Sequence, residues 1–232
     1  MGEDTVEGTK ERLFLAAVKV FARTGYKGAT VREICRIAGA ANINAINYYF
    51  GGKEKLYKAI LDAMFSAYQK RKEKQASGKQ NRKRPEERLR NYIDSYCSIL
   101  FSGGEIAREM AAIFLAEMSR PSRYLDEMVQ KYMTPEAEEL TGIVRDILGP
   151  KTPLPVLRNS AVSIIGQITY YSFAWPMFSR AVPDHPPMED YKAFLADHVY
   201  RFSLGGLAAI KKASASGNLA AAPRKKGAKK SR

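Results

Sequence analysis

Hydrophobic residues recur at helical spacing along almost the whole chain, and no stretch alternates in the way a β-strand would. The apolar positions of residues 13–21 predict a first amphipathic helix, which ends near Gly25 because glycine suits a left-handed helix cap. Residues 30–33 (TVRE) have the form of a capping box and predict a short second helix, followed by a tight turn at Gly39. Asn42 is the predicted N-cap of a third short helix.

Longer helices are predicted in the rest of the sequence. Lys53 begins one after a glycine pair that breaks the chain, and Pro85 suits the first position of the next. Two long and strongly apolar helices are predicted at residues 155–178 and 188–210. The predicted fold class is therefore all-α, with an N-terminal three-helix helix-turn-helix domain followed by a larger helical domain.

Composition suggests where the chain divides. We expect a flexible N-terminus at residues 1–8, the helix-turn-helix domain at 9–55 and the larger helical domain at 56–210. A basic linker lies at about 69–90 within the larger domain. Residues 211–232 are rich in Lys, Ala, Ser and Gly without periodicity, so they are predicted to form a disordered basic tail.

The charge of the chain is unevenly distributed. Its 232 residues carry 38 Lys and Arg against 24 Asp and Glu, a net charge of +14, which favours a partner that bears phosphates. Residues 69–90 hold ten basic and three acidic side chains, and residues 211–232 hold eight basic and no acidic ones. Residues 91–210 are net acidic, so the whole surface is not built to coat nucleic acid. A solvated linker and a solubilising tail are the alternative interpretation.

The third short helix has an unusual outer face. On a helical wheel, one side carries Ile43, Ile46, Asn47 and Phe50, and the other carries Ala41, Asn44, Ala45 and Tyr48. Small residues and amides allow close approach to DNA and hydrogen bonds to base edges, whereas tyrosine hydroxyls and lysine suit phosphates. The alternative is a small capped bundle with exposed tyrosines. The predicted DNA-binding residues are Thr30, Arg32, Asn42, Asn44, Ala45, Asn47, Tyr48, Tyr49 and Lys53.

Two segments of this region resemble a known family. TVREICRIAG at residues 30–39, followed by NYYFGGKEKLY at residues 47–57, resembles the TetR family of bacterial transcriptional regulators and, within it, a CecR-like subgroup. The segment from Gly39 to Phe50 is one residue longer than the family pattern. Aligned backwards from Phe50, Asn42 takes the place of the family's serine cap and Asn47 that of its frequent phosphate-binding tyrosine.

The resemblance implies a cytoplasmic homodimer that represses transcription at a palindromic, double-stranded DNA operator and is released by a small-molecule effector bound in the second domain. The two apolar helices at 155–178 and 188–210 fit the dimer interface, and the small residues of 203–209 would allow close approach. An internal core pair is the alternative for these helices.

Adaptable side chains in the larger domain suggest an effector pocket. Methionine and aromatic residues form forgiving apolar pockets, although each residue alone is more often part of the core. A net acidic domain favours an apolar or cationic effector. The predicted pocket residues are Tyr96, Met110, Phe114, Met118, Met128, Tyr132, Gln167, Tyr171 and Trp175.

Other functions have little support. The two histidines show no metal-ligand spacing, and no motif for a cofactor or for hydrolase chemistry is present, so we expect no enzyme. The start of the chain lacks a signal peptide, no apolar run could span a membrane, and two cysteines suit a reducing cytosol. The competing interpretations are a sequence-independent architectural protein that binds through the linker and tail, and an enzyme that retains a helix-turn-helix.

Overall fold

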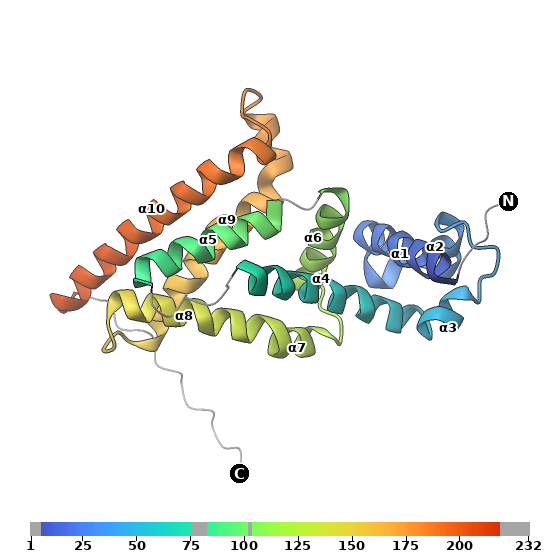
Figure 1. The fold of residues 1–232 in the computed structure, drawn as a ribbon, viewed down its shortest axis with the longest axis horizontal. Coiled ribbons are helices and arrows are strands. Elements are labelled where there is room, and N and C mark those ends of the chain that lie inside the picture. Colours follow the sequence, from blue (N-terminus) through green and yellow to red (C-terminus); the bar gives the residue numbers. More distant parts are fainter. Residues whose placement is uncertain (1–5, 76–82, 102–103, 219–232) are drawn as a thin grey trace, which may run out of the picture.

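The computed structural model describes residues 6–75, 83–101 and 104–218, and every regular element in these ranges is a helix (Figure 1). The all-α prediction is thus confirmed. The helices are α1 Val6–Gly28, α2 Val31–Ile37, α3 Ala45–Phe50, α4 Lys53–Gln75, α5 Pro85–Phe101, α6 Gly104–Ser119, α7 Leu125–Met128, a π-helical turn Val129–Met133, α8 Thr134–Leu148, α9 Leu154–Ala181 and α10 Met188–Ala215.

The N-terminal helices form a separate core at one end of the molecule (Figure 1). Gly25 interrupts α1 with a φ of 67°, as its position in the sequence predicts. Residues from α1 to α4 bury their apolar sides together, and Phe21, Ile34, Ile46 and Leu56 are all fully buried. This burial fixes the short helices α2 and α3, which could not be stable alone.

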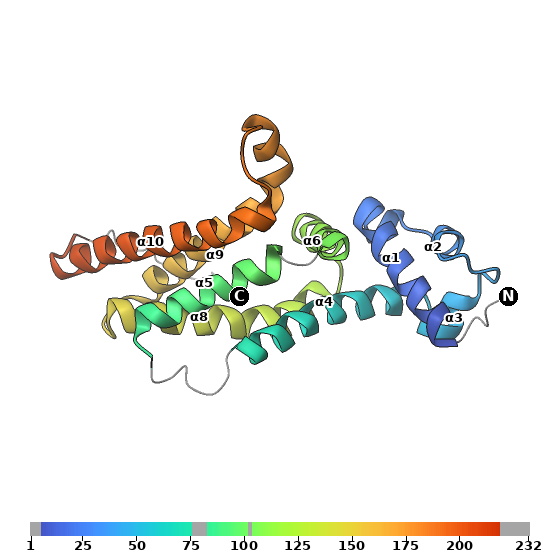
Figure 2. The same ribbon diagram turned by 45° about the horizontal axis from the view of Figure 1, so that its top comes forward.

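A second core lies among α5, α8, α9 and α10 at the other end of the molecule (Figures 1 and 2). The two cores do not divide the chain at residue 55, as the sequence suggested. Leu56 and Leu61 of α4 belong to the N-terminal core, and so do Ile113 of α6 and Met128 of α7. The predicted boundary at residue 55 cuts through α4, a continuous helix whose buried residues Leu56 and Ile60 pack in the N-terminal core.

A buried hydrogen bond joins α4 to the α6–α7 connection. Tyr57, which is 1% exposed, donates its hydroxyl to Glu117 Oε1 at 2.5 Å, and Glu117 is itself only 2% exposed. The other carboxylate oxygen accepts from the backbone N–H of Ser122 at 3.0 Å and from its hydroxyl at 2.9 Å. The pKa of the Tyr57 phenol is raised by burial and by this carboxylate, so Tyr57 stays a donor.

The helices extend further than the composition suggested. The predicted linker is wrong in part, because residues 69–75 belong to α4 and residues 85–90 to α5. The predicted tail is also wrong at its start, since α10 continues through Lys211 to Ala215. Lys211 donates to the carbonyl of Ile147 at 2.8 Å, and a cation is favourable near the end of α8.

The remaining predicted segments are the flexible N-terminus, the centre of the linker and the rest of the tail. Residues 6–8, expected to be flexible, form the first turn of α1. Residues 1–5, 76–82 and 219–232, which carry the rest of the predicted N-terminus, linker and tail, lie outside the described part of the chain.

Removing the hydroxyl of Tyr57 should test the buried joint. Tyr57→Phe leaves the Glu117 carboxylate buried without one of its donors, so the free energy of unfolding should fall by about 1–3 kcal/mol. Tyr48→Phe is the matched control, because Tyr48 is 79% exposed and its loss should change stability by less than about 0.5 kcal/mol. Urea unfolding followed by circular dichroism measures both, and equal stability of the two variants would contradict the assignment.

Candidate nucleic-acid interface

The geometry of α2 and α3 is set by two polar side chains and a glycine turn. Thr30 caps α2, and its hydroxyl accepts from the N–H of Glu33 at 3.2 Å, as the sequence predicts. Gly39 then takes a φ of 65°, which turns the chain towards α3. Asn42 Oδ1 accepts from the N–H of Asn44 at 2.8 Å, so Asn42 caps a turn, and α3 itself begins only at Ala45.

This turn changes which side chains of α3 face outward. The carbonyl of Asn42 accepts from the N–H of Ala45 at 3.0 Å, a bond tighter than that of an α-helix, so the register of the helical wheel shifts. Ala45, expected to face DNA, is buried, whereas Ile43, on the opposite side of the wheel, is exposed. Asn47, a predicted DNA-binding residue that the wheel placed on the same side as Ile43, is also exposed. The wheel prediction is therefore wrong for Ala45.

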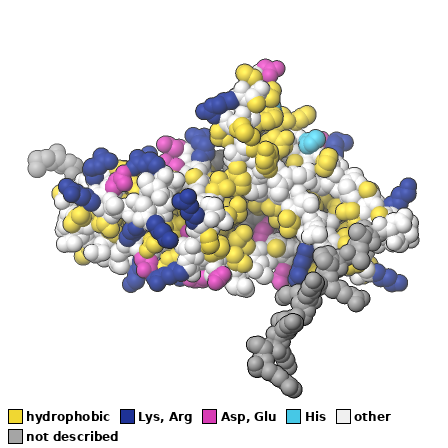
Figure 3. Space-filling view, turned by 180° about the vertical axis from the view of Figure 1, so that it is seen from behind, with side chains coloured by type: hydrophobic (Ala, Val, Ile, Leu, Met, Phe, Trp, Pro, Cys, Tyr) yellow, Lys and Arg dark blue, Asp and Glu magenta, His cyan; other side chains and the backbone are white. Residues whose placement is uncertain are grey.

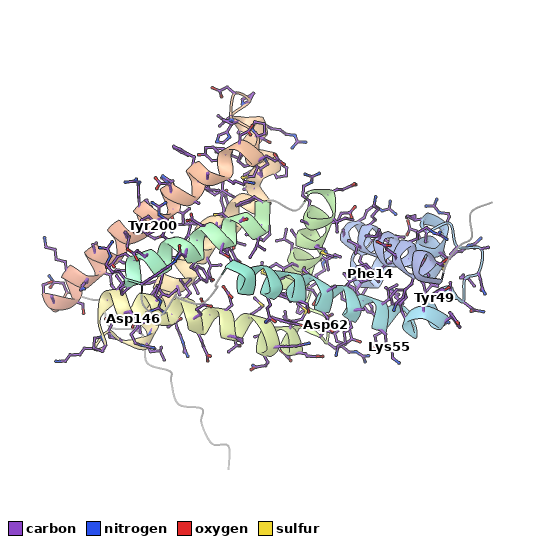
Figure 4. All side chains as sticks on the ribbon, viewed as in Figure 1. Phe14, Tyr49, Lys55, Asp62, Asp146 and Tyr200 are labelled. Atoms are coloured by element: carbon purple, nitrogen blue, oxygen red, sulfur yellow. The ribbon has the colours of Figure 1, made fainter. Side chains whose placement is uncertain are left out.

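The exposed side chains form one stripe. We call Ile43, Asn44, Asn47 and Tyr48 the reading surface, because they lie at helical spacing and all are exposed. Tyr48 is 79% exposed and Ile43 is 49% exposed. Tyr49 is only half-buried against the N-terminal core, and Figure 4 shows it at the same end of the molecule.

Basic residues flank the reading surface along the sequence but are absent from it. Residues 37–52 contain no Asp, Glu, Lys or Arg, in a chain that is 27% charged. Arg32 and Arg36 are exposed and lie before this segment. Lys55 is exposed and lies after it, near the start of α4 (Figure 4). Neutral hydrogen-bonding groups flanked by cations match a duplex groove, in which base edges lie between two rows of phosphates.

Lys53 has a different place from the one predicted. Its ammonium group donates to the carbonyl of Ala29 at 2.6 Å and lies 4.7 Å from the ring centroid of Tyr26. Burial lowers the pKa of Lys53 from its ordinary value. Lys53 therefore ties the start of α4 to the segment that precedes α2, instead of extending freely towards a phosphate.

The predicted pocket residues lie in two separate groups. Met110, Phe114, Met128 and Tyr132 lie with the N-terminal core or with Phe65 of α4, and the rings of Phe65 and Tyr132 stack at 4.9 Å. Tyr96, Tyr171 and Trp175 pack instead against the second core, where Gln167 donates to Ser163 and Ser203. Met118 is 49% exposed. The nine residues thus do not line one cavity.

Composition alone did not reveal the polar groups inside the second core. Side-chain oxygen atoms of Tyr92, Glu136 and Thr169 are buried there, and the Tyr96 hydroxyl interacts with Thr169. Burial raises the pKa of Tyr96, which keeps the phenol neutral. The signal in the sequence was weak, because hydroxyls and a single carboxylate are common on helices. Buried polar groups within an apolar core are the usual means by which a ligand site fixes orientation.

In the part of the chain that the structure describes, no group of three or more His, Cys, Asp or Glu side chains could hold a metal ion. None of its helices is both long and apolar enough to cross a membrane.

Both parts of the chain match known sequence families. Residues 13–60 match the bacterial regulatory proteins of the tetR family, and residues 85–207 match the C-terminal domain of the HTH-type transcriptional dual regulator CecR. The chain belongs to the TetR family, in its CecR-like branch. The predicted resemblance is thus confirmed for both domains of this TetR-family regulator.

Curated relatives match shorter stretches. The HTH-type transcriptional repressor NicS of Pseudomonas putida is 37% identical over 60 residues, which is 26% of this chain and 28% of NicS. The probable HTH-type transcriptional regulator YttP of Bacillus subtilis is 27% identical over 128 residues, which is 55% of this chain and 59% of YttP. The chain therefore matches less than two thirds of the length of either relative.

Solved structures share the fold. The fatty acid degradation regulator FadR from Bacillus halodurans superposes with a TM-score of 0.60 at 19% identity, over 89% of this chain and 97% of FadR. AibR, in complex with isovaleryl coenzyme A and operator DNA, superposes with a TM-score of 0.62 at 15% identity, over 83% of this chain and 96% of AibR. At these identities the likeness shows the fold of a TetR-family regulator.

Lys53 and Lys55 offer a matched pair, since they lie two residues apart on α4. Lys53→Ala should lower the free energy of unfolding by about 1–2 kcal/mol, because it removes a hydrogen bond and a cation–π contact. Lys55→Ala should leave stability within about 0.5 kcal/mol of the parent and should flatten the salt dependence of DNA binding by about one charge. Thermal unfolding and a salt titration separate the two roles, and a destabilising Lys55→Ala would reverse the assignment.

Proposed function

We propose that this TetR-family chain represses transcription by binding a palindromic operator as a homodimer, and that a small ligand in the second core releases it. The observation that carries the proposal is the uncharged reading surface between exposed cations. Amides such as those of Asn44 and Asn47 can form paired hydrogen bonds with adenine in the major groove. The exposed arginines of α2 suit the flanking phosphates.

The exposed apolar side chains of the last two helices support the homodimer. Val162, Tyr170 and Met177 on α9, together with Phe194 and Phe202 on α10, are each 61–69% exposed. Figure 3 shows hydrophobic side chains gathered over the projecting α9–α10 hairpin. A monomer would leave these large groups in water, whereas a two-fold partner would bury them in a four-helix interface.

The buried polar groups of the second core support a ligand site there. Tyr96 and Thr169 would orient a polar group of the effector, and Tyr171 and Trp175 would contact its apolar part. An effector that is mostly apolar fits this composition best. AibR, which shares the fold, was solved with an acyl coenzyme A, and acyl compounds are therefore the first class to test.

Selection of bound fragments from genomic DNA tests the DNA-binding proposal directly. The purified chain should retain fragments that share an approximate palindrome, and the complex should sediment with two copies of the 25.9 kDa chain per duplex. Asn44→Ala should weaken binding to the selected duplex by about 1–3 kcal/mol and relax the base preference at one position of each half-site.

Asn218→Ala is the matched control, because Asn218 is an exposed amide beyond the end of α10. It should bind the selected duplex like the parent. A protein that retains random fragments with equal affinity would instead be an architectural nucleic-acid-binding protein, and a tightly binding monomer would exclude the dimer.

Trp175, the single tryptophan of the chain, provides a probe of the ligand site. Fatty acids of graded length, their coenzyme A thioesters and long-chain alkylamines should be titrated while its emission is recorded. A true effector should change the emission and weaken operator binding over the same concentration range, because only differential affinity shifts a conformational equilibrium.

Two threonine variants locate the site. Thr169→Val removes the buried hydroxyl at nearly constant volume and should weaken ligand binding, whereas Thr152→Val, in the α8–α9 connection, should not. Ligand binding that leaves operator affinity unchanged would contradict release through this domain.

A further inference from the structure

Ile43 is a large apolar side chain within the reading surface, and 49% of it is exposed. The core position in this part of the chain is taken by Ile46, which is fully buried. The carbonyl of Ile43 lies 3.8 Å from the Cys35 thiol, which donates to it, and Asn42 fixes the turn on the other side. The backbone is thereby held with the Ile43 side chain outward, next to Asn44.

In the major groove of DNA, an apolar side chain can make an apolar contact with only one group on the base edges. Base edges there present hydrogen-bond donors and acceptors, and the single apolar group among them is the C5-methyl of thymine. An amide prefers adenine, whose pairing partner is thymine, so neighbouring amide and aliphatic side chains together suit a run of A·T pairs.

We propose that Ile43 contacts the methyl group of a thymine in each operator half-site, next to the base pair that Asn44 reads. The inference rests on the proposed operator binding and adds a determinant of sequence specificity. Ile43 would then exclude cytosine, which presents an amino group and no methyl, at that position.

The test replaces thymine by deoxyuridine, one position at a time, in the duplex selected by the full-length protein. Uracil keeps the hydrogen-bonding edge of thymine and lacks only its methyl group. The affinity of the parent protein should fall about fourfold for a substitution in one half-site and about 15-fold when both half-sites are substituted. The effect should be confined to one or two positions in each half-site.

Ile43→Ala should bind the thymine and uracil duplexes equally well at that position, whereas Met118→Ala should keep the sensitivity of the parent. Met118 is the matched control because it is also 49% exposed but lies on α6, away from the reading surface. Thermal unfolding should show that both variants are folded.

The outcomes separate this inference from the proposed function. A parent protein that binds the operator but tolerates uracil at every position overturns the methyl contact and leaves operator binding intact. If the Ile43→Ala protein remains sensitive to uracil, another residue contacts the thymine methyl group. That result also overturns the proposed contact of Ile43. Failure of the parent to select any sequence overturns the proposed function itself.

Discussion

The orientation of the DNA-binding end depends on the buried hydrogen bond between Tyr57 and Glu117. A carboxylate that is 2% exposed loses most of its hydration, so it is stable only with donors in place, and Tyr57 and Ser122 provide them. Tyr57 belongs to α4 and Glu117 to α6, so the bond joins two helices that both contribute to the N-terminal core. Neither partner can move away without leaving the other buried and unsatisfied.

From Tyr57 the contacts continue to the segment that precedes α2. Its ring packs at 4.8 Å against both Phe21 and Tyr26, and the ammonium group of Lys53 lies over Tyr26. Lys53 in turn holds the carbonyl of Ala29, the residue before the α2 cap. The position of α2 relative to α6 is therefore defined by a continuous series of packed groups, and a displacement of α6 must either carry α2 with it or break one of these contacts.

The ion pairs that join α4 to α7 and to the π-helical turn after it act differently. Lys58 with Glu127, and Lys131 with Asp62, join exposed groups, with Asp62 labelled midway along α4 in Figure 4. Exposed pairs contribute little to stability and can be exchanged for water at small cost. The buried bond is thus the firm connection, and the exposed pairs add little to it.

The sequence predicted those features of this architecture that depend on neighbouring residues. The Thr30 cap and the turns at Gly39 and Gly51 follow from local backbone chemistry, and all three are present. The outward face of α3 could not be predicted from a uniform helical wheel, because the turn at Asn42 changes its register. Nor could composition show that Met128 belongs to one core and Tyr96 to the other, since tertiary packing decides which apolar residues meet.

We propose that the reading surface separates affinity from specificity. Affinity for DNA comes mainly from cations that displace counterions from phosphates, and here these cations flank an uncharged segment. A lysine or arginine within residues 37–52 that contacted only phosphates would add affinity for every sequence alike and would reduce the ratio between operator and random DNA. Neutral amides and an aliphatic side chain contribute only when the correct base edge lies opposite, because otherwise they lose water without gaining a partner. On the proposed function, the neutral side chains of this segment would therefore add sequence discrimination to a protein whose net charge of +14 attracts any duplex.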